Sequence, residues 1–274
     1  MSQRRPRSRF AIGLALAFGG AIFFALPLFM TMEMWWLGFY MHRLRLALFL
    51  AAFIPVLVGL SHYAGFEGTD RWSDDVRDAF VALFVGFATS AGVLLLAGAV
   101  DLEKPLREAV GQITLSAIPA SVGAALAESL LGATRPNEER KRRKMGYGGE
   151  LFLMAAGAIF FAFNIAPTEE MMVVAFKVQG WWVVTASLLS LVLMHAFVYA
   201  VEFRGGHGPH DAAEGWSLFL RFTVVGYAIV LLMSAYVLWT FGRLDESSLD
   251  FCISATIVLA FPASLGAAAA RLVL

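Results

Sequence analysis

The polar residues best suited to chemistry lie at matching positions in two apolar stretches of this 274-residue sequence. They comprise carboxylates, hydroxyls and one amide, at Thr31, Glu33, Asn164, Thr168, Glu169 and Glu170. Oxygen ligands of this kind suit hard cations or protons rather than soft metals. An ionised carboxylate within a bilayer is costly unless it meets water, a cation or a partner charge. These residues therefore predict an ion pathway.

The depth of the glutamates depends on the helices that carry them. About seven further apolar residues follow Glu33 and Glu170, which places both carboxylates about 10 Å inside the outer end of a continuous helix. If the two carboxylates meet, they resemble the acidic rings that select cations, and proximity would raise the pKa of one of them. The alternative is that they reach the outer headgroups or pair with Arg43, Arg45 or Lys177.

A second repeated element, Pro-Ala-Ser-x-Gly-Ala-Ala, begins at Pro119 and again at Pro262. Proline kinks a helix, and the small residues that follow have the spacing that lets two helix backbones touch. The element therefore predicts tight packing across the two halves of the chain. The alternative is that the two kinks form a gate, with Ser121 and Ser264 lining an ion path.

Further charged or titratable residues lie inside the apolar stretches. Glu128 and Arg271 occupy matching positions with opposite charge, which predicts an ion pair between the two halves. His195 has no counterpart in the other half. It could relay protons near neutral pH, and the simpler alternative is a hydrogen bond to a neighbouring helix.

The composition points to a membrane environment for all these residues. Hydrophobic residues make up 59 % of the chain and charged residues 15 %, so the apolar surface exceeds what one soluble core can bury. A bilayer core about 30 Å thick needs about 20 apolar residues per helix. The stretches that meet or approach this length are residues 10–40, 44–64, 79–100, 107–131, 150–176, 180–202, 216–241 and 249–273. The fourth is the weakest, because it carries Arg107, Glu108 and Gln112.

The two halves of the sequence are related by duplication. Gly-Ala-Ile-Phe-Phe-Ala begins at Gly20 and again at Gly157, and the elements at Pro119 and Pro262 follow in the same order. The eighth stretch is the copy of the fourth and is plainly apolar, so both are predicted to be spans.

Basic residues set the expected orientation. Arginines cluster before residue 10 and basic residues cluster between Arg135 and Lys144, and such clusters mark the cytoplasmic side. The prediction is an all-α integral membrane protein with eight transmembrane helices, arranged as two parallel four-helix repeats with both termini cytoplasmic. The repeats comprise residues 1–133 and 149–274, and the linker 134–148 between them is expected to attract anionic lipid. Loops 65–78 and 203–215 are expected on the same side.

The functional prediction is a channel or carrier for a small cation or protons. The alternative is a non-transporting scaffold or sensor that binds another membrane protein. An intramembrane enzyme using His195 is the weakest idea, because common catalytic signatures are absent, and we predict no catalytic residues, metal or cofactor. The single cysteine, Cys252, excludes a disulfide within the chain. The basic residues lack interleaved aromatics, which argues against nucleic-acid binding, and a homo-oligomer stays open.

The repeated Gly-Ala-Ile-Phe-Phe-Ala segments, Pro167-Thr-Glu-Glu170 and the Pro-Ala-Ser-x-Gly elements resemble a family of bacterial inner-membrane proteins of unknown function. The resemblance covers most of the chain. It implies the cytoplasmic membrane of a bacterium, and it implies no substrate or catalytic residues.

Overall fold

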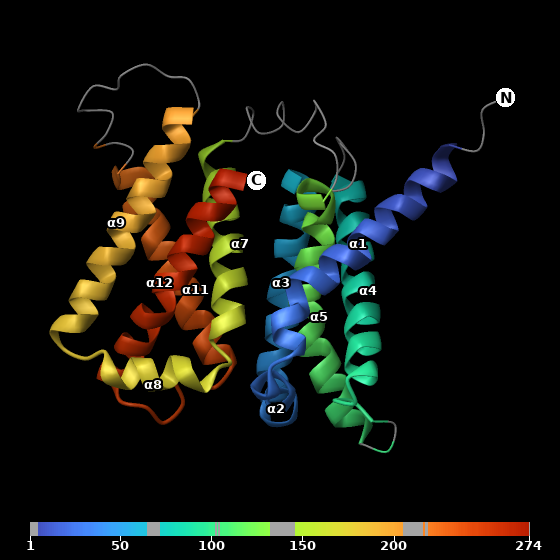
Figure 1. Cartoon of the computed structure of the whole chain (residues 1–274), viewed down its shortest axis with the longest axis horizontal. Helices are drawn as coiled ribbons and strands as arrows, with labels where there is room; N and C mark the ends of the chain where they lie inside the picture. Colours follow the sequence, from blue (N-terminus) through green and yellow to red (C-terminus); the bar gives the residue numbers. More distant parts are fainter. Residues whose placement is uncertain are drawn as a thin grey trace. The chain divides into compact units, whose positions relative to one another are not determined.

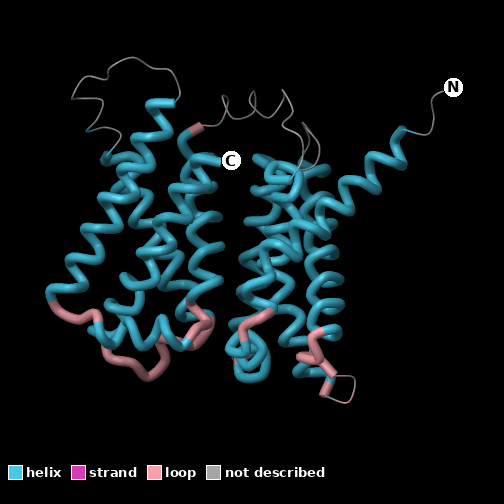
Figure 2. The backbone as a smooth tube through the Cα atoms, viewed as in Figure 1, coloured by secondary structure: helices cyan, strands magenta, loops and turns pink. Residues whose placement is uncertain are grey.

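The computed structural model describes the backbone of residues 5–64, 72–101, 103, 105–131, 146–204, 216 and 219–273. Side chains of residues 5–10, 64, 128–131, 198–204 and 272–273 lie outside this description, as does nearly all of the linker 134–148. Every regular element in the described ranges is helical (Figure 2). The chain forms two compact units, Met1–Lys144 and Met145–Leu274.

Both units have the same order of elements, with a short helix after the first long one (Figure 1). The first unit comprises α1 (Arg5–Phe29), α2 (Met32–Tyr40), α3 (Arg43–Ala64), α4 (Trp72–Leu96) and α5 (Leu106–Leu131). The second comprises α7 (Tyr147–Ile165), α8 (Glu169–Lys177), α9 (Trp181–Arg204), the π-helical segment η1 (Phe219–Val224), α11 (Val225–Thr240) and α12 (Leu249–Val273). Seven of the described helices are long and apolar enough to cross a membrane, or eight when the bent pair α8 and α9 counts as one span. The chain is therefore a multi-pass, all-helical membrane protein.

The last helix of each unit packs against all the others in that unit. In the first unit, α5 contacts α1, α2, α3 and α4, and in the second α12 contacts α7, α8, α9 and α11. Residues buried inside the protein make up 89 % of the apolar stretch of α5, against 28 to 39 % in α1, α3 and α4. A helix that faces other helices rather than lipid needs small side chains more than apolar ones. This explains why the span with the weakest hydropathy is nevertheless a full helix.

Glycines allow the first and last helices of each unit to touch. A methyl group at Gly20 would lie 2.6 Å from Cβ of Ala127 and would collide with the carbonyl oxygen of Gly123. At the equivalent crossing of α7 and α12, a methyl group at Gly157 would lie 2.6 Å from Cβ of Ala270. The small residues after Pro119 and Pro262 thus pack within their own units, where the sequence led us to expect packing across the halves.

Two predicted spans, residues 10–40 and 150–176, are broken rather than continuous. The chain leaves the helical conformation at Thr31 (φ −97°, ψ 123°) and at Thr168 (φ −71°, ψ 143°). Pro167 adds a second reason in the second unit, because its nitrogen has no hydrogen to continue the helical ladder. Figure 1 shows α8 lying across one end of its unit beside α12, and its axis is bent by 117° from that of α9.

The predicted loop 65–78 is shorter than expected, because α4 begins at Trp72. Asp75 lies in the first turn, where a negative charge is favourable beside the helix N-terminus. Its side chain is 1 % exposed and lies 2.8 Å from Nδ1 of His62 near the end of α3. The imidazole also stacks on the indole of Trp72 with ring centroids 5.5 Å apart. This cluster ties α3 to α4.

Candidate functional site

The predicted ion-pathway residues cluster at the breaks between α1 and α2 and between α7 and α8. Thr31 and Thr168 each precede a short helix, and their hydroxyls donate backwards to Leu28 O at 3.0 Å and Ile165 O at 2.8 Å. The two breaks therefore share one local geometry in which the threonine closes the end of the preceding helix. The depth estimate for the glutamates, which assumes a continuous helix, does not apply.

Protein donors already occupy the carbonyl oxygens at both breaks. The indole nitrogen of Trp35 donates to Phe29 O at 2.9 Å, and Nη2 of Arg243 donates to Pro167 O. The amide of Asn164 donates to Phe160 O at 2.8 Å, and its Oδ1 is buried without a hydrogen bond to any described residue. Oxygens that accept hydrogen bonds from the protein are poor candidates for stripping water from a cation.

The three glutamates beside the breaks are at least partly accessible to solvent. Glu169 and Glu170 are exposed in the first turn of α8, and Glu33 is half-buried in the first turn of α2. Among the described residues, none forms an ion pair with these three carboxylates. Each lies at a helix N-terminus, where a negative charge is stabilised by about 0.3–1 kcal/mol.

Arg243 is a member of this site that the sequence did not reveal. It lies in the turn between α11 and α12 and reaches the α7–α8 break 76 residues earlier in the chain. The adjacent Phe241 packs edge-on against Phe163, with ring centroids 5.0 Å apart. No basic residue occupies the matching stretch of the first half from Ala99 to Asp101, so the repeat gave no signal for it.

Replacing Arg243 with methionine is expected to loosen α8. A hydrogen bond from a charged donor contributes about 1.5 kcal/mol, which corresponds to about tenfold faster opening. Hydrogen–deuterium exchange of α8 amides in detergent micelles measures this change, and α2 amides serve as the internal control. Unchanged exchange in α8 would show that the Arg243 contact does not hold the break.

The residues of the predicted gate are packed into their own helices. Ser121 and Ser264 are fully buried, and their hydroxyls donate to Ala117 O at 2.6 Å and Phe261 O at 2.7 Å. Both bonds lie next to Pro119 and Pro262, where a turn of the helix lacks its regular donor. The side chains are thus engaged with backbone, and a gating role stays a prediction.

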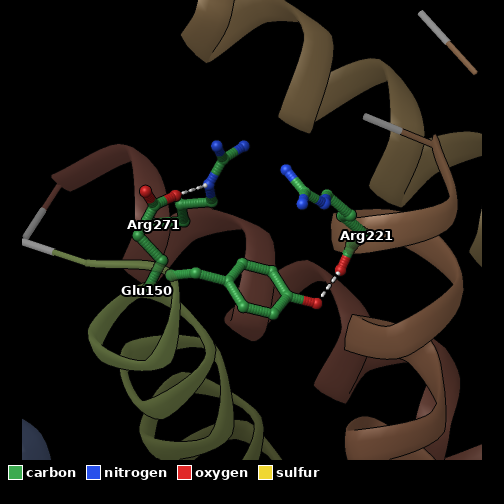
Figure 3. A network of polar contacts seen from close by, with 4 residues as sticks. Glu150, Arg221 and Arg271 are labelled. Atoms are coloured by element: carbon green, nitrogen blue, oxygen red, sulfur yellow. Dashed lines mark hydrogen bonds and ion pairs between the residues drawn. The ribbon is translucent and has the colours of Figure 1, made fainter. Parts of the chain in front are cut away.

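A second polar group lies at the opposite end of the second unit (Figure 3). Arg271 of α12 forms an ion pair with Glu150 of α7, with Nε and Oε2 2.7 Å apart. The guanidinium lies 3.9 Å from the ring centroid of Phe222, and the hydroxyl of Tyr147 donates to Arg221 O at 2.8 Å. The side chain of Glu128, which the sequence paired with Arg271, lies outside the described residues, so that pair stays a prediction.

His195 contacts the π-helical segment η1. Its Nδ1 lies 3.0 Å from the hydroxyl of the buried Thr223, and its ring meets Phe219 edge-on at 5.2 Å. Both partners belong to η1, so the histidine forms the hydrogen bond to a neighbouring element that the sequence allowed. The proton relay stays a prediction.

Within the described part of the chain, no group of three or more His, Cys, Asp or Glu side chains could hold a metal ion. Cys252 is a free thiol in α12.

Comparison with known proteins gives one match. Residues 13–274 match the model of the family named "Putative integral membrane protein (DUF2391)". Neither the curated proteins nor the solved structures contain a match. The match covers nearly the whole of both units, so the chain belongs to the DUF2391 family of integral membrane proteins, whose function is unknown.

Proposed function

We propose that this protein is a non-enzymatic membrane subunit that binds a basic segment of another membrane protein through the carboxylates of α8. The carrying observation is a contrast at the helix breaks. The threonine hydroxyls and several carbonyls are satisfied inside the chain, while Glu169 and Glu170 are exposed and form no ion pair with described residues. Such carboxylates complement a basic partner.

The surface around the glutamates also favours an interface. Val173, Val174 and Phe176 are exposed on α8, and Trp181 and Trp182 are exposed at the start of α9. Exposed apolar and aromatic side chains beside charged ones are typical of surfaces that meet a partner or the membrane interface. A basic partner segment could therefore lie along α8 with its apolar residues against this surface.

The orientation of the chain in the membrane is part of the same proposal. The basic residues around the start of the chain and in the linker favour the cytoplasm for both termini, so α2 and α8 lie on the outer side. Four spans in each unit make the two repeats parallel. The resemblance from the sequence adds the cytoplasmic membrane of a bacterium as the location.

A second candidate is the passage of a small cation or protons. Its support is that Glu33 and Glu170 occupy matching positions at the starts of α2 and α8. Acidic side chains are the groups that select cations in many channels. The occupied carbonyls at both breaks make this the weaker of the two candidates.

Neutralising both glutamates of α8 is expected to weaken binding of a basic probe about fivefold. Exposed ion pairs contribute about 0.5 kcal/mol each, so two together amount to about a factor of five. The measurement is the affinity of labelled hexalysine for the protein in nanodiscs of neutral lipid, comparing the parent with Glu169→Gln/Glu170→Gln.

The matched control neutralises Glu246 and Asp250, which are exposed carboxylates of the loop and helix start at the same end of the second unit. This control should bind the probe within about twofold of the parent, given weak surface pairs. Equal loss in both double variants would mean that the probe senses only net charge and would overturn the proposal. Cation or proton flux in liposomes that requires Glu33 and Glu170 would instead favour the second candidate.

A further inference from the structure

We propose that the end of the second unit where α7 begins and α12 ends binds the phosphate of an anionic phospholipid through Arg221. This end lies opposite α8 within the unit (Figure 1), and the proposal shares with the proposed function only the orientation of the chain in the membrane. Arg221 belongs to the polar group drawn in Figure 3.

The described group contains two guanidinium groups and one carboxylate. Glu150 pairs with Nε of Arg271 at 2.7 Å. Arg221 is exposed, and within the described residues no carboxylate lies in ion-pair range of it. The exposed guanidinium of Arg221 therefore presents a positive charge at the surface, which favours an anion.

The π-helical segment η1 fixes the position of Arg221. Three consecutive residues of η1 contact three different helices: the carbonyl of Arg221 accepts from Tyr147 of α7, Phe222 lies under the Arg271 guanidinium of α12, and Thr223 meets His195 of α9. A π-helical turn holds an extra residue and is frequent at functional sites. Here it fixes the backbone of Arg221 while the side chain stays exposed.

The Arg221 guanidinium lies within an ordered group of side chains. Figure 3 shows Arg221, from η1, in the same polar group as Glu150 of α7 and Arg271 of α12. The Arg221 guanidinium lies 6.0 Å from the centroid of the Tyr147 ring. A planar guanidinium matches phosphate oxygens with two parallel hydrogen bonds, so an exposed arginine at this place suits a phosphate.

The surroundings favour a lipid as the source of the phosphate. The exposed aromatic residues Tyr147 and Trp216 lie beside Arg221 and Phe219, and such residues concentrate at the level of the lipid headgroups. The orientation that the basic residues favour places this end at the cytoplasmic leaflet, where anionic lipids gather.

The matching place in the first half lacks these groups. When the two halves of the sequence are aligned by their repeated segments, Gly13 matches Glu150, Val81 matches Arg221 and Glu128 matches Arg271. The site should therefore exist once per chain, in the second unit. A general attraction of basic residues to anionic membranes would not discriminate between the two units.

Arg221→Gln is expected to weaken the binding of phosphatidylglycerol about fivefold, the contribution of one arginine near a membrane surface. The measurement is retention of phosphatidylglycerol against phosphatidylcholine by the full chain, using native mass spectrometry of protein from mixed-lipid nanodiscs. The hydrogen bond from Tyr147 ends on the Arg221 backbone oxygen, so the substitution leaves that contact in place.

Arg77→Gln is the matched control, because Arg77 is an exposed arginine near the start of α4. It should retain phosphatidylglycerol like the parent. Equal retention by Arg221→Gln and the parent, or equal loss in both variants, would overturn the proposal. Displacement of the lipid by millimolar inorganic phosphate would identify free phosphate as the ligand and would also overturn it.

Discussion

Replacing Glu150 with leucine is expected to lower the free energy of unfolding of the second unit by about 3 kcal/mol. The Arg271 side chain is 8 % exposed and depends on Glu150 for its ion pair at 2.7 Å. Removing the carboxylate leaves a buried guanidinium charge without this compensation, and that cost exceeds the net contribution of the pair itself. Denaturation of the purified protein in mixed micelles, followed by tryptophan fluorescence, measures the loss.

The double variant Glu150→Leu/Arg271→Met distinguishes the effect of an uncompensated charge on stability from the effect of altered packing. It removes both charges and should recover most of the stability, because a buried ion pair is often replaceable by apolar residues. Glu169→Gln removes an exposed carboxylate of the same unit and should change stability by less than about 0.5 kcal/mol. If the double variant were as unstable as the single one, packing rather than an uncompensated charge would explain the loss.

Gly123→Ala is expected to destabilise the first unit by about 3 kcal/mol, the upper part of the usual range for overpacking. The added methyl group would lie 2.6 Å from Cβ of Phe24 and would collide with the carbonyl oxygen of Gly20. The obstacle includes backbone, which cannot rotate away as a side chain can, so α1 and α5 must separate. The same unfolding experiment measures the effect.

Gly92→Ala supplies the control for the crossing of α1 and α5. Gly92 lies in α4 of the same unit, and a methyl group there would meet no atom within 4 Å. Alanine favours helix over glycine by about 1 kcal/mol, so this variant should be stabilised or unchanged. Similar losses at Gly92 and Gly123 would contradict the close crossing as the source of the effect.

The repeat predicted more of the fold than hydropathy did. The fourth span carries Arg107, Glu108 and Gln112, and hydropathy alone ranks it last, but its apolar copy identified it as a span. The breaks at Thr31 and Thr168 escaped prediction, because apolar residues follow both and a hydropathy profile contains no information on chain direction. Threonine capping and Pro167 were the available signals.

Partners across long sequence separations could not be predicted. Small-residue spacing indicated that Gly123 and Gly266 would touch another helix, but the spacing does not specify which one. In the structure each touches the first helix of its own unit, and packing across the halves stays a prediction. Glu150 and Arg271 lie 121 residues apart, and no periodicity joins them. The candidate carboxylates were identified by type and repetition, whereas their exposure depends on the direction of α8.

The enclosed position of α5 has a consequence for the biosynthesis of the first unit. It is the least apolar of the candidate spans and leaves the ribosome after α1, α3 and α4. Such a segment partitions poorly into lipid by itself, because insertion from the translocon depends on apolar character. The earlier helices provide the surfaces that α5 needs, so its integration and the tertiary assembly of the unit become one event.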